Sequence, residues 1–322
     1  MKKRVYVTRA IPEKALNILE EHFEVSVFQE KRPITKKEIM RLAKGYDGLL
    51  PLLTDEVDAK VMEKTGIKAI ANFAVGVDNI DIEAATARKI PVTNTPGVLT
   101  DATADLTWAL ILAVTRRIVE ADNYLRSGRW KGWDPLLLLG GDLRDRTLGI
   151  IGLGRIGRAV AERAKGFGMN VIYNSRTAFD GDEKYLGIRF VSLEELLKES
   201  DFVSIHAPHT EKTHHLIGMK QLEMMKPSAY LINTSRGKLI NEEELVLALQ
   251  EGKIAGAGLD VFYDEPRVNK ELIKFPNVVL LPHIGSASLE TRTKMAVIAA
   301  ENMVEALQEQ RPRNIVNPEI YN

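Results

Sequence analysis

Apolar and polar positions along the first hundred residues predict short buried strands separated by amphipathic helices. Helical periodicity fits Glu13–His22, Thr35–Ala43, Val57–Thr65 and Ile82–Arg88, with a capping box from Thr35 to Glu38 and Pro12 at a helix start. Strands are expected at Arg4–Thr8, Glu24–Phe28, Gly48–Leu53, Ile67–Phe73 and Pro91–Asn94. This alternation is typical of a parallel sheet with helical crossovers.

A second alternating run begins at Thr147 and continues until the pattern turns helical over Glu290–Gln308. Its expected strands are Thr147–Ile151, Asn170–Asn174, Phe202–His206, Ala229–Asn233, Gly256–Leu259 and Val278–Leu281. The long final helix can return the chain to the first domain. The pattern therefore predicts an α/β fold class with two doubly wound parallel-sheet domains, the second having at least six strands.

The segment between the two runs reads as one long helix, from about Asp101 to Ser127. Its middle, Leu106–Val114, is apolar on all sides, and such a helix has to be buried on all sides. We therefore expect it at a domain or subunit interface. The loop that follows contains Trp130 and Trp133 beside glycine and proline, and a binding role for them is as plausible as the filling of a surface gap.

Composition narrows the class of protein. The 322 residues suggest two domains, and a hydrophobic content of 45% is enough for sizeable cores. The 44 basic and 44 acidic residues balance, which gives no support for binding nucleic acid or a membrane surface. No signal peptide or membrane span is apparent. Cysteine is absent, which excludes disulfides and cysteine-ligated metals and fits the reducing cytoplasm.

A glycine fingerprint follows the strand Thr147–Ile151. It reads Gly152-Leu-Gly154-Arg-Ile-Gly157, and it leads into a helical pattern from Ile156 to about Gly168. In a dinucleotide-binding fold the first glycine permits a tight turn, the second lets the backbone approach a pyrophosphate, and the third lets the helix pack on the strand. The helix N-terminus then presents free N–H groups to the pyrophosphate. The context of strand, loop and helix therefore predicts a Rossmann domain.

Three chemically active side chains follow strands of this second run. Arg236 comes after Ala229–Asn233, Glu265 after Gly256–Leu259, and His283 after Val278–Leu281. Because ligands of open α/β sheets bind at the carboxyl ends of strands, these side chains are expected at one edge. Carbonyl reduction needs a proton and an electrostatic anchor, which an imidazole and a guanidinium can supply. A carboxylate paired with the ring would favour the imidazolium form.

The end of the second strand of the Rossmann run bears on the choice of cofactor. An acid at this place accepts hydrogen bonds from the ribose hydroxyls of NAD. Residues 173–177 contain no acid, and Ser175, Arg176 and Thr177 offer two hydroxyls and a guanidinium. This set favours the 2′-phosphate of NADP(H), with NAD as a less preferred cofactor. The alternative is that Arg176 is a solvated surface charge.

The remaining histidines do not suggest a further site. His22, His206, His209, His214 and His215 have no comparable context, although the pair His214-His215 would be compatible with a metal. No carboxylate cluster accompanies that pair, so no metal is expected.

The motifs together resemble the D-isomer-specific 2-hydroxyacid dehydrogenases over essentially the whole chain. Within that family the chain is most similar to the branch of glyoxylate and glyoxylate/hydroxypyruvate reductases, where Ser-Arg-Thr also follows the second strand. The motifs that carry the resemblance are Gly152–Gly157, Asn233-Thr-Ser-Arg-Gly237, Asp260-Val-Phe-x-x-Glu265-Pro266, Pro282-His283-Ile-Gly-Ser286, Ala74–Asp81 and Asn94-Thr-Pro-Gly97.

The resemblance implies a role for each matching residue. Arg236 would bind substrate, Glu265 would support the histidine, and His283 would be the acid–base. The substrate carboxylate would lie on the backbone of Val75 and Gly76, and Leu52 or Leu53 would form a wall of the pocket. The residues implied in cofactor binding are Thr103, Gly152, Leu153, Gly154, Arg155, Ile156, Gly157, Ser175, Arg176, Thr177, Ala207, Pro208, Thr234, Ser235, Asp260 and Gly285.

The resemblance also implies the domain organisation and the assembly. Residues 1–99 and 287–322 would form a flavodoxin-like substrate domain, and residues 100–286 the inserted NADP(H)-binding domain. The family is typically a homodimer through its cofactor domains, and in the glyoxylate branch a tryptophan reaches the partner's active site. Trp130 and Trp133 are both candidates for this role.

The expected activity is NADPH-dependent reduction of a small 2-oxo acid, glyoxylate and hydroxypyruvate first. Phosphoglycerate and phosphite dehydrogenases share the motifs and are the alternative within the same enzyme class. A nucleotide-sensing corepressor, which would not be an enzyme, is the alternative from a different class.

Overall fold

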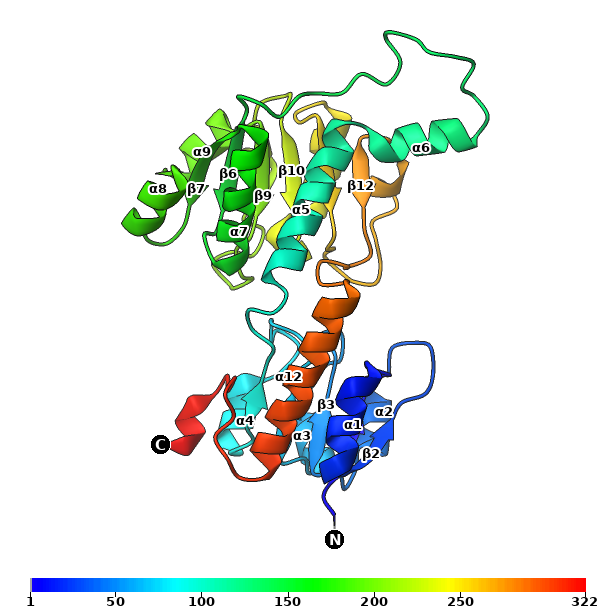
Figure 1. Cartoon of the computed structure of the whole chain (residues 1–322), viewed down its shortest axis with the longest axis vertical. Coiled ribbons are helices and arrows are strands. Elements are labelled where there is room, and N and C mark those ends of the chain that lie inside the picture. Colours follow the sequence, from blue (N-terminus) through cyan, green and yellow to red (C-terminus); the bar gives the residue numbers. More distant parts are fainter. Residues whose placement is uncertain (1) are drawn as a thin grey trace. The chain divides into compact units, whose positions relative to one another are not determined.

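The computed structural model describes residues 2–322, which divide into two compact units (Figure 1). One unit comprises Met1–Leu99 together with Ala287–Asn322, and the other comprises Thr100–Ser286. Each unit is built around its own parallel sheet, so the predicted fold class of two parallel α/β domains is confirmed. Among the described residues, no helix combines the length and the apolar character needed to traverse a bilayer.

The first unit contains a five-stranded parallel sheet in the order β2-β1-β3-β4-β5, the order of flavodoxin-like folds. Its strands are β1 (Arg4–Val7), β2 (Glu24–Val27), β3 (Gly48–Leu50), β4 (Ala69–Ala71) and β5 (Val92–Thr93). The helices are α1 (Glu13–His22), α2 (Lys36–Leu42), α3 (Ala59–Thr65), α4 (Ile82–Ala87) and α12 (Leu289–Leu307), and a 3₁₀ turn, η4, spans Pro318–Tyr321.

The alternation of side chains along β1 divides the core of this unit between the two faces of the sheet. Val5 and Val7 pack with α1 and α12, which lie side by side in Figure 1. Tyr6 packs on the opposite face with residues of α2, α3 and α4. Because both faces are covered, the strands are apolar on both sides, as parallel strands generally are.

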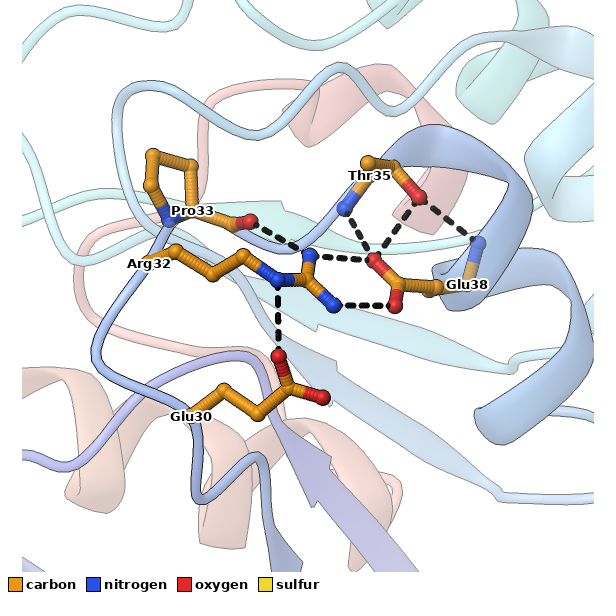
Figure 2. A network of polar contacts seen from close by, with 5 residues as sticks. All are labelled: Glu30, Arg32, Pro33, Thr35 and Glu38. Carbon is orange, nitrogen blue, oxygen red and sulfur yellow. Dashed lines mark hydrogen bonds and ion pairs between the residues drawn. The ribbon is translucent and has the colours of Figure 1, made fainter.

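The start of α2 shows how a local sequence signal becomes structure (Figure 2). The Oγ1 of Thr35 accepts a hydrogen bond from the N–H of Glu38, and the Glu38 carboxylate accepts one from the N–H of Thr35 at 2.9 Å. This is the predicted capping box. Figure 2 also shows Arg32 bonded to both Glu38 oxygens, at 2.6 and 2.8 Å, and paired with Glu30. The hydrogen bond from Arg32 holds the pKa of Glu38 far below its ordinary value.

The second unit contains a seven-stranded parallel sheet in the order β12-β11-β10-β9-β6-β7-β8. Counted from β6, this is the Rossmann order with one further strand at its edge. The strands are β6 (Thr147–Ile151), β7 (Asn170–Asn174), β8 (Arg189–Phe190), β9 (Phe202–Ile205), β10 (Tyr230–Asn233), β11 (Gly256–Leu259) and β12 (Val278–Leu280).

Helices cover both faces of the second sheet. Leu148 and Ile150 of β6 pack with residues of α5 and α7, whereas Ile151 packs with α9, α10 and α11. The helices are α5 (Thr100–Thr115), α6 (Ile118–Arg126), α7 (Arg155–Ala164), α8 (Asp180–Leu186), α9 (Leu193–Glu199), α10 (Met219–Leu222) and α11 (Glu242–Gln250). Three 3₁₀ turns complete the unit: η1 (Lys165–Phe167), η2 (Gly237–Leu239) and η3 (Leu272–Lys274).

The prediction of one helix over residues 101–127 is wrong. Helix α5 ends at Thr115, Arg117 adopts a left-handed φ of 51°, and α6 starts a new axis at Ile118. The carbonyl of Thr115 accepts a hydrogen bond from the N–H of Gly141, 26 positions later, instead of continuing the helix. Burial of α5 on all sides is also not observed, because Asp101, Asp105 and Ala109 are exposed in the single chain.

Other differences concern element ends. The first-unit strands β3 and β4 are shorter than predicted, and the helix after the glycine fingerprint ends at Ala164 before the 3₁₀ turn η1. Strand β8 was not predicted, because it has only two residues and both are exposed.

Candidate active site

The glycine fingerprint spans the loop after β6 and the start of α7, and the structure shows why Gly152 and Gly157 have no side chain. Gly152 has a φ of 96°, which L side chains rarely adopt, and a Cβ there would lie 2.8 Å from the backbone of Ala207. A Cβ on Gly157 would lie 2.2 Å from the carbonyl oxygen of Gly152. Any side chain at either position would therefore push the loop away from the sheet.

The surroundings of Gly154 fit a nicotinamide dinucleotide. A Cβ on Gly154 would meet nothing within 4 Å, so the backbone borders open space. Gly154 is the N-cap of α7, and no side chain caps this helix end. The first N–H groups of α7, beginning at Arg155 and Ile156, are therefore available to a pyrophosphate.

The loop after β7 contains Ser175, Arg176 and Thr177, as the sequence indicated. Arg176 and Thr177 are exposed, and the Oγ of Ser175 donates a hydrogen bond to the carbonyl of Thr177. Further along, the N–H of Phe179 donates to the buried hydroxyl of Tyr173 at 2.8 Å. The hydroxyl of Tyr173 therefore ties this loop to the strand that precedes it.

His283 and Glu265, which follow β12 and β11, form a direct pair. The Nδ1 of His283 lies 2.7 Å from Oε2 of Glu265, and the two side chains are 28% and 23% exposed. The other oxygen of Glu265, Oε1, accepts the N–H of Phe262 at 3.0 Å. Because an ionised carboxylate can only accept, Nδ1 of His283 is the donor, and Nε2 is the nitrogen that can exchange a proton.

Electrostatics keep Glu265 ionised. Burial alone would raise the pKa of its carboxyl, but the hydrogen bond and charge of His283, the N–H of Phe262 and the charge of Arg236 outweigh burial. The pKa of Glu265 is therefore lower than its ordinary value. A carboxylate that is ionised at neutral pH stabilises positive charge on the imidazole next to it.

Arg236 reaches this neighbourhood because of Gly237. A Cβ on Gly237 would lie only 1.9 Å from the backbone carbon of Phe262, so the two backbones are in direct contact. The carbonyl of Arg236 accepts the side-chain amide of Asn233 at 2.9 Å, and its Nη1 donates to the carbonyl of Ser235. Gly237 thus allows the loop that contains Arg236 to approach the loop that contains Glu265.

Asp260 holds the histidine loop in place. Its carbonyl accepts the N–H of His283 at 2.9 Å, and its carboxylate accepts the N–H groups of Ile284 and Gly285 at 2.8 and 2.7 Å. Burial raises the pKa of Asp260 above its ordinary value, although these hydrogen bonds and the charge of His283 oppose the shift. His283 itself has a left-handed φ of 54°, a strained conformation that such bonds can maintain.

The other residues that the sequence associated with the cofactor lie after strands, except Thr103, which lies in α5. Thr234 bonds Thr107, whose hydroxyl donates to the carbonyl of Thr103 at 2.8 Å. The Oγ of Ser235 donates to the carbonyl of Ala207, which precedes Pro208. A Cβ on Gly285 would lie 3.4 Å from Thr103. Thr107 was not predicted, and only its polarity within an apolar helix marked it.

The predicted substrate residues Leu52, Val75 and Gly76 belong to the first unit. Leu52 follows β3, and Val75 and Gly76 follow β4, at the carboxyl edge of that sheet. Among the described residues, Arg9 Nε and Thr95 Oγ1 are the buried side-chain polar atoms that have no hydrogen-bond partner. Both residues follow strands at the same edge of the sheet, β1 and β5.

The remaining histidines have structural explanations. Burial lowers the pKa of His206 to about 4, and its Nε2 lies 2.8 Å from the hydroxyl of Ser204. His209 bonds His214 at 3.1 Å, and His214 stacks on His215. Among the side chains that the structure describes, no three histidine, aspartate or glutamate residues are grouped as metal ligands.

Comparison with known proteins identifies the family. Residues 108–285 match the family model of the NAD-binding domain of D-isomer specific 2-hydroxyacid dehydrogenases. Two glyoxylate reductases are similar over nearly their whole length. That of Thermococcus litoralis is 52% identical over 325 residues, covering 99% of this chain and 98% of the relative. That of Korarchaeum cryptofilum is 53% identical over 323 residues, covering 99% and 97%.

A solved structure extends the comparison to three dimensions. The NADPH-dependent glyoxylate/hydroxypyruvate reductase of Sinorhizobium meliloti, in complex with NADP and malonate, superimposes with a TM-score of 0.86 at 35% identity. The match covers 99% of this chain and 98% of that chain. The chain therefore belongs to the D-isomer specific 2-hydroxyacid dehydrogenases, which are NAD(P)-dependent oxidoreductases.

Proposed function

We propose that this enzyme reduces glyoxylate, and also hydroxypyruvate, to the 2-hydroxy acid with NADPH in the reducing cytoplasm, which the cysteine-free sequence favours. The observation that carries the proposal is the His283–Glu265 pair in the same unit as an uncapped glycine loop. The names of the similar proteins support the choice of substrate.

The chain's own residues supply the acid. When bound, the reduced nicotinamide supplies a hydride to the carbonyl carbon of the substrate. As the carbonyl π bond breaks, Nε2 of His283 donates its proton to the oxygen, and the imidazolium becomes neutral imidazole. Glu265 remains a carboxylate throughout and keeps the ring oriented through Nδ1. The positive charge of Arg236 stabilises the negative charge that develops on the oxygen.

We assign the substrate carboxylate to the backbone N–H groups of Val75 and Gly76 in the first unit. Leu52 would limit the size of the group next to the carbonyl. A small 2-oxo acid has one carboxylate for the N–H groups of Val75 and Gly76, and glyoxylate is the smallest such acid, which is why it is the first candidate.

A steady-state panel tests the function. The purified enzyme is assayed with glyoxylate, hydroxypyruvate, pyruvate and phosphohydroxypyruvate, each with NADPH and with NADH. Phosphite, which would be oxidised, is assayed with NADP⁺ and with NAD⁺. We expect glyoxylate with NADPH to have the highest kcat/KM. A phosphorylated substrate or phosphite ahead of glyoxylate would replace the proposed substrate, and no turnover with any of them would remove the enzymatic proposal.

The cofactor preference depends on Arg176. We propose that Ser175, Arg176 and Thr177 hold the 2′-phosphate of NADPH, because this exposed loop contains a cation and two hydroxyls. Arg176→Ala is expected to weaken NADPH binding by roughly 1.5–3 kcal/mol, the value of a charge-assisted hydrogen bond. NADH, which lacks the phosphate, should bind the variant as it binds the wild type. Fluorescence titration with both cofactors measures this, and an unchanged NADPH/NADH ratio would contradict the assignment.

We further propose a homodimer through the cofactor-binding unit. Large apolar side chains are concentrated in α6 and the loop after it, which extend from the unit in Figure 1. Those that are exposed are Ile118, Val119, Leu125, Trp130, Trp133, Leu136 and Leu139, and Trp133 is 85% exposed. A soluble monomer rarely exposes such a patch. Either tryptophan would then be able to reach the partner's active site.

The proposed dimer interface can be tested by a substitution in α6. Leu125→Glu places a charge on the apolar face of α6 and is expected to convert the dimer to a monomer at micromolar concentration, because a buried unpaired charge is costly. Light scattering coupled to gel filtration measures the mass. Tyr185→Glu, at an exposed aromatic residue of α8, is the matched control and should leave the mass unchanged. A wild-type monomer would refute the dimer.

A further inference from the structure

The loop that follows β4 has an unusual backbone arrangement at residues 74–77. Three consecutive carbonyl oxygens each accept a hydrogen bond from another residue of the first unit. That of Ala74 accepts the N–H of Thr95 at 2.9 Å, that of Val75 accepts Nδ2 of Asn94 at 2.7 Å, and that of Gly76 accepts Nδ2 of Asn72 at 2.8 Å. The conformation of this loop is thus imposed by side-chain amides and not by a regular element.

These bonds determine where the N–H groups of the same peptides lie. In a trans peptide the N–H points away from the carbonyl, so the N–H groups of Val75, Gly76 and Val77 are directed opposite to the bound oxygens. No hydrogen bond within residues 2–322 uses these three N–H groups as donors. All three residues are half-buried. Consecutive unpaired N–H groups of this kind form a concave site for an anion.

Hydrogen bonds between side-chain amides hold Asn72 in place. Asn72, which is fully buried, and Asn79 exchange hydrogen bonds between their side chains, at 3.2 and 3.3 Å. Nδ2 of Asn79 also lies 3.0 Å from the carbonyl of Leu52 and 3.1 Å from that of Asp55. Asn79 therefore connects the loop after β4 with the loop after β3.

The loop after β3 has its own anchor. The carboxylate of Asp55, only 2% exposed, accepts the N–H of Leu52 at 2.8 Å and the hydroxyl of Thr8 at 2.5 Å. Burial raises the pKa of Asp55, opposed by these bonds and by the charge of Arg9. Leu52 is therefore held from both sides, by Asp55 and by Asn79.

We propose that Asn72, Asn79 and Asn94 are positioning residues for substrate recognition. They hold the carbonyls of the loop after β4 inward, so that its N–H groups stay aligned for the carboxylate of the 2-oxo acid. This inference rests on the proposed function, which assigns that carboxylate to Val75 and Gly76. Asparagine suits the task because one side chain supplies donors and an acceptor, whereas aspartate has no donor for a carbonyl.

The test compares Asn94→Ala and Asn79→Ala with a control at the other end of the same strand. Asn317 bonds the N–H of Val92 at 2.9 Å and the carbonyl of Ile90 at 2.9 Å, at the amino end of β5. Asn317→Ala removes comparable bonds from the same unit without touching the loops after β3 and β4. Thermal unfolding of all three variants measures the loss of stability.

The kinetic constants for the preferred 2-oxo acid separate positioning from a structural role. Asn94→Ala and Asn79→Ala are expected to raise KM by about tenfold or more, because a small displacement of a binding group has a large effect. The inhibition constant of oxamate, a non-reducible carboxylate analogue, should rise by the same factor, with smaller changes in kcat. Asn317→Ala should keep the wild-type KM even where its unfolding temperature falls as far.

Two results would overturn the inference: a wild-type KM and oxamate constant in folded Asn94→Ala, or the same rise in KM in Asn317→Ala. If Asn79→Ala does not fold, Asn94→Ala decides alone, since it removes the single bond to Val75. The proposed function is tested separately, by the substrate panel with the wild type. The variants are compared on whichever 2-oxo acid the wild type reduces best, so a different preferred substrate would not affect this comparison.

Discussion

Replacing His283 with alanine is expected to lower kcat for 2-oxo acid reduction by about 10²–10⁴-fold, the usual contribution of a positioned general acid. The imidazole is held by Glu265 through Nδ1, so Nε2 is the nitrogen that can protonate the substrate oxygen. The cofactor affinity should change little, because the glycine loop after β6 does not depend on the ring. Stopped-flow measurement of NADPH oxidation and a separate cofactor titration distinguish the two quantities.

A second substitution at the same position separates the loss of the imidazole from a change in backbone strain. Because His283 has a left-handed φ, alanine adds strain, whereas asparagine tolerates this region better. His283→Asn should therefore lose as much activity as His283→Ala while retaining more stability. His22→Ala, at an exposed histidine of the first unit, should behave as the wild type. Wild-type turnover in either His283 variant would mean that another group is the acid.

Replacing Glu265 with glutamine is expected to lower kcat by about 10²–10⁴-fold, because the carboxylate orients the catalytic histidine and stabilises its charged form. Glutamine is nearly isosteric and can still accept from Phe262 and His283. It lacks the negative charge that stabilises the imidazolium. The loss would therefore report on charge and not on packing.

The pH dependence of reductive kcat/KM is a second measurement of the role of Glu265. Activity depends on the ionised carboxylate of Glu265, so reductive kcat/KM should fall at low pH, where Glu265 becomes protonated. The pKa of Glu265 is below its ordinary value, because His283 and the other partners outweigh the effect of burial, so in the wild type this fall should occur below the pH at which an ordinary glutamate is protonated. Glu265→Gln has no carboxylate to protonate, so its lower activity should not show this fall.

Glu242→Gln is the matched control for the pH profile. Burial raises the pKa of Glu242, and its Oε1 accepts the N–H of Tyr263, but it makes no hydrogen bond to His283. Its profile should follow that of the wild type. If the fall at low pH persisted unchanged in Glu265→Gln, the protonation of Glu265 would not be its cause.

Much of the candidate site was predictable from the sequence because its signals are local. Gly152, Gly154 and Gly157 act within one turn of chain, so their spacing was sufficient to predict the loop. The presence of Arg236, Glu265 and His283 at one edge followed from the rule that parallel strands share their carboxyl ends. The capping box at Thr35 and Glu38 needed only four consecutive residues.

Contacts between distant residues were not predictable in this way. At the break between α5 and α6 the carbonyl of Thr115 accepts the N–H of Gly141, and residues 115–118 contain no glycine or proline that would mark the break. The approach of Arg236 to Glu265 requires Gly237 to touch the backbone of Phe262, 25 residues away. Asn94 reads in the sequence as an ordinary loop residue until its partner, the carbonyl of Val75, is known.

By itself, the sequence determined the periodicity of the two sheets, the glycine loop and the set of reactive side chains, because these depend on neighbours within a few residues. Only the tertiary structure decided which nitrogen of His283 meets Glu265, which carboxyl oxygens Asp260 offers to the histidine loop, and which carbonyls the asparagines hold. Hydrogen bonds have a narrow range of distance and direction. They are settled only when the packed backbone has brought distant segments to within about 3 Å.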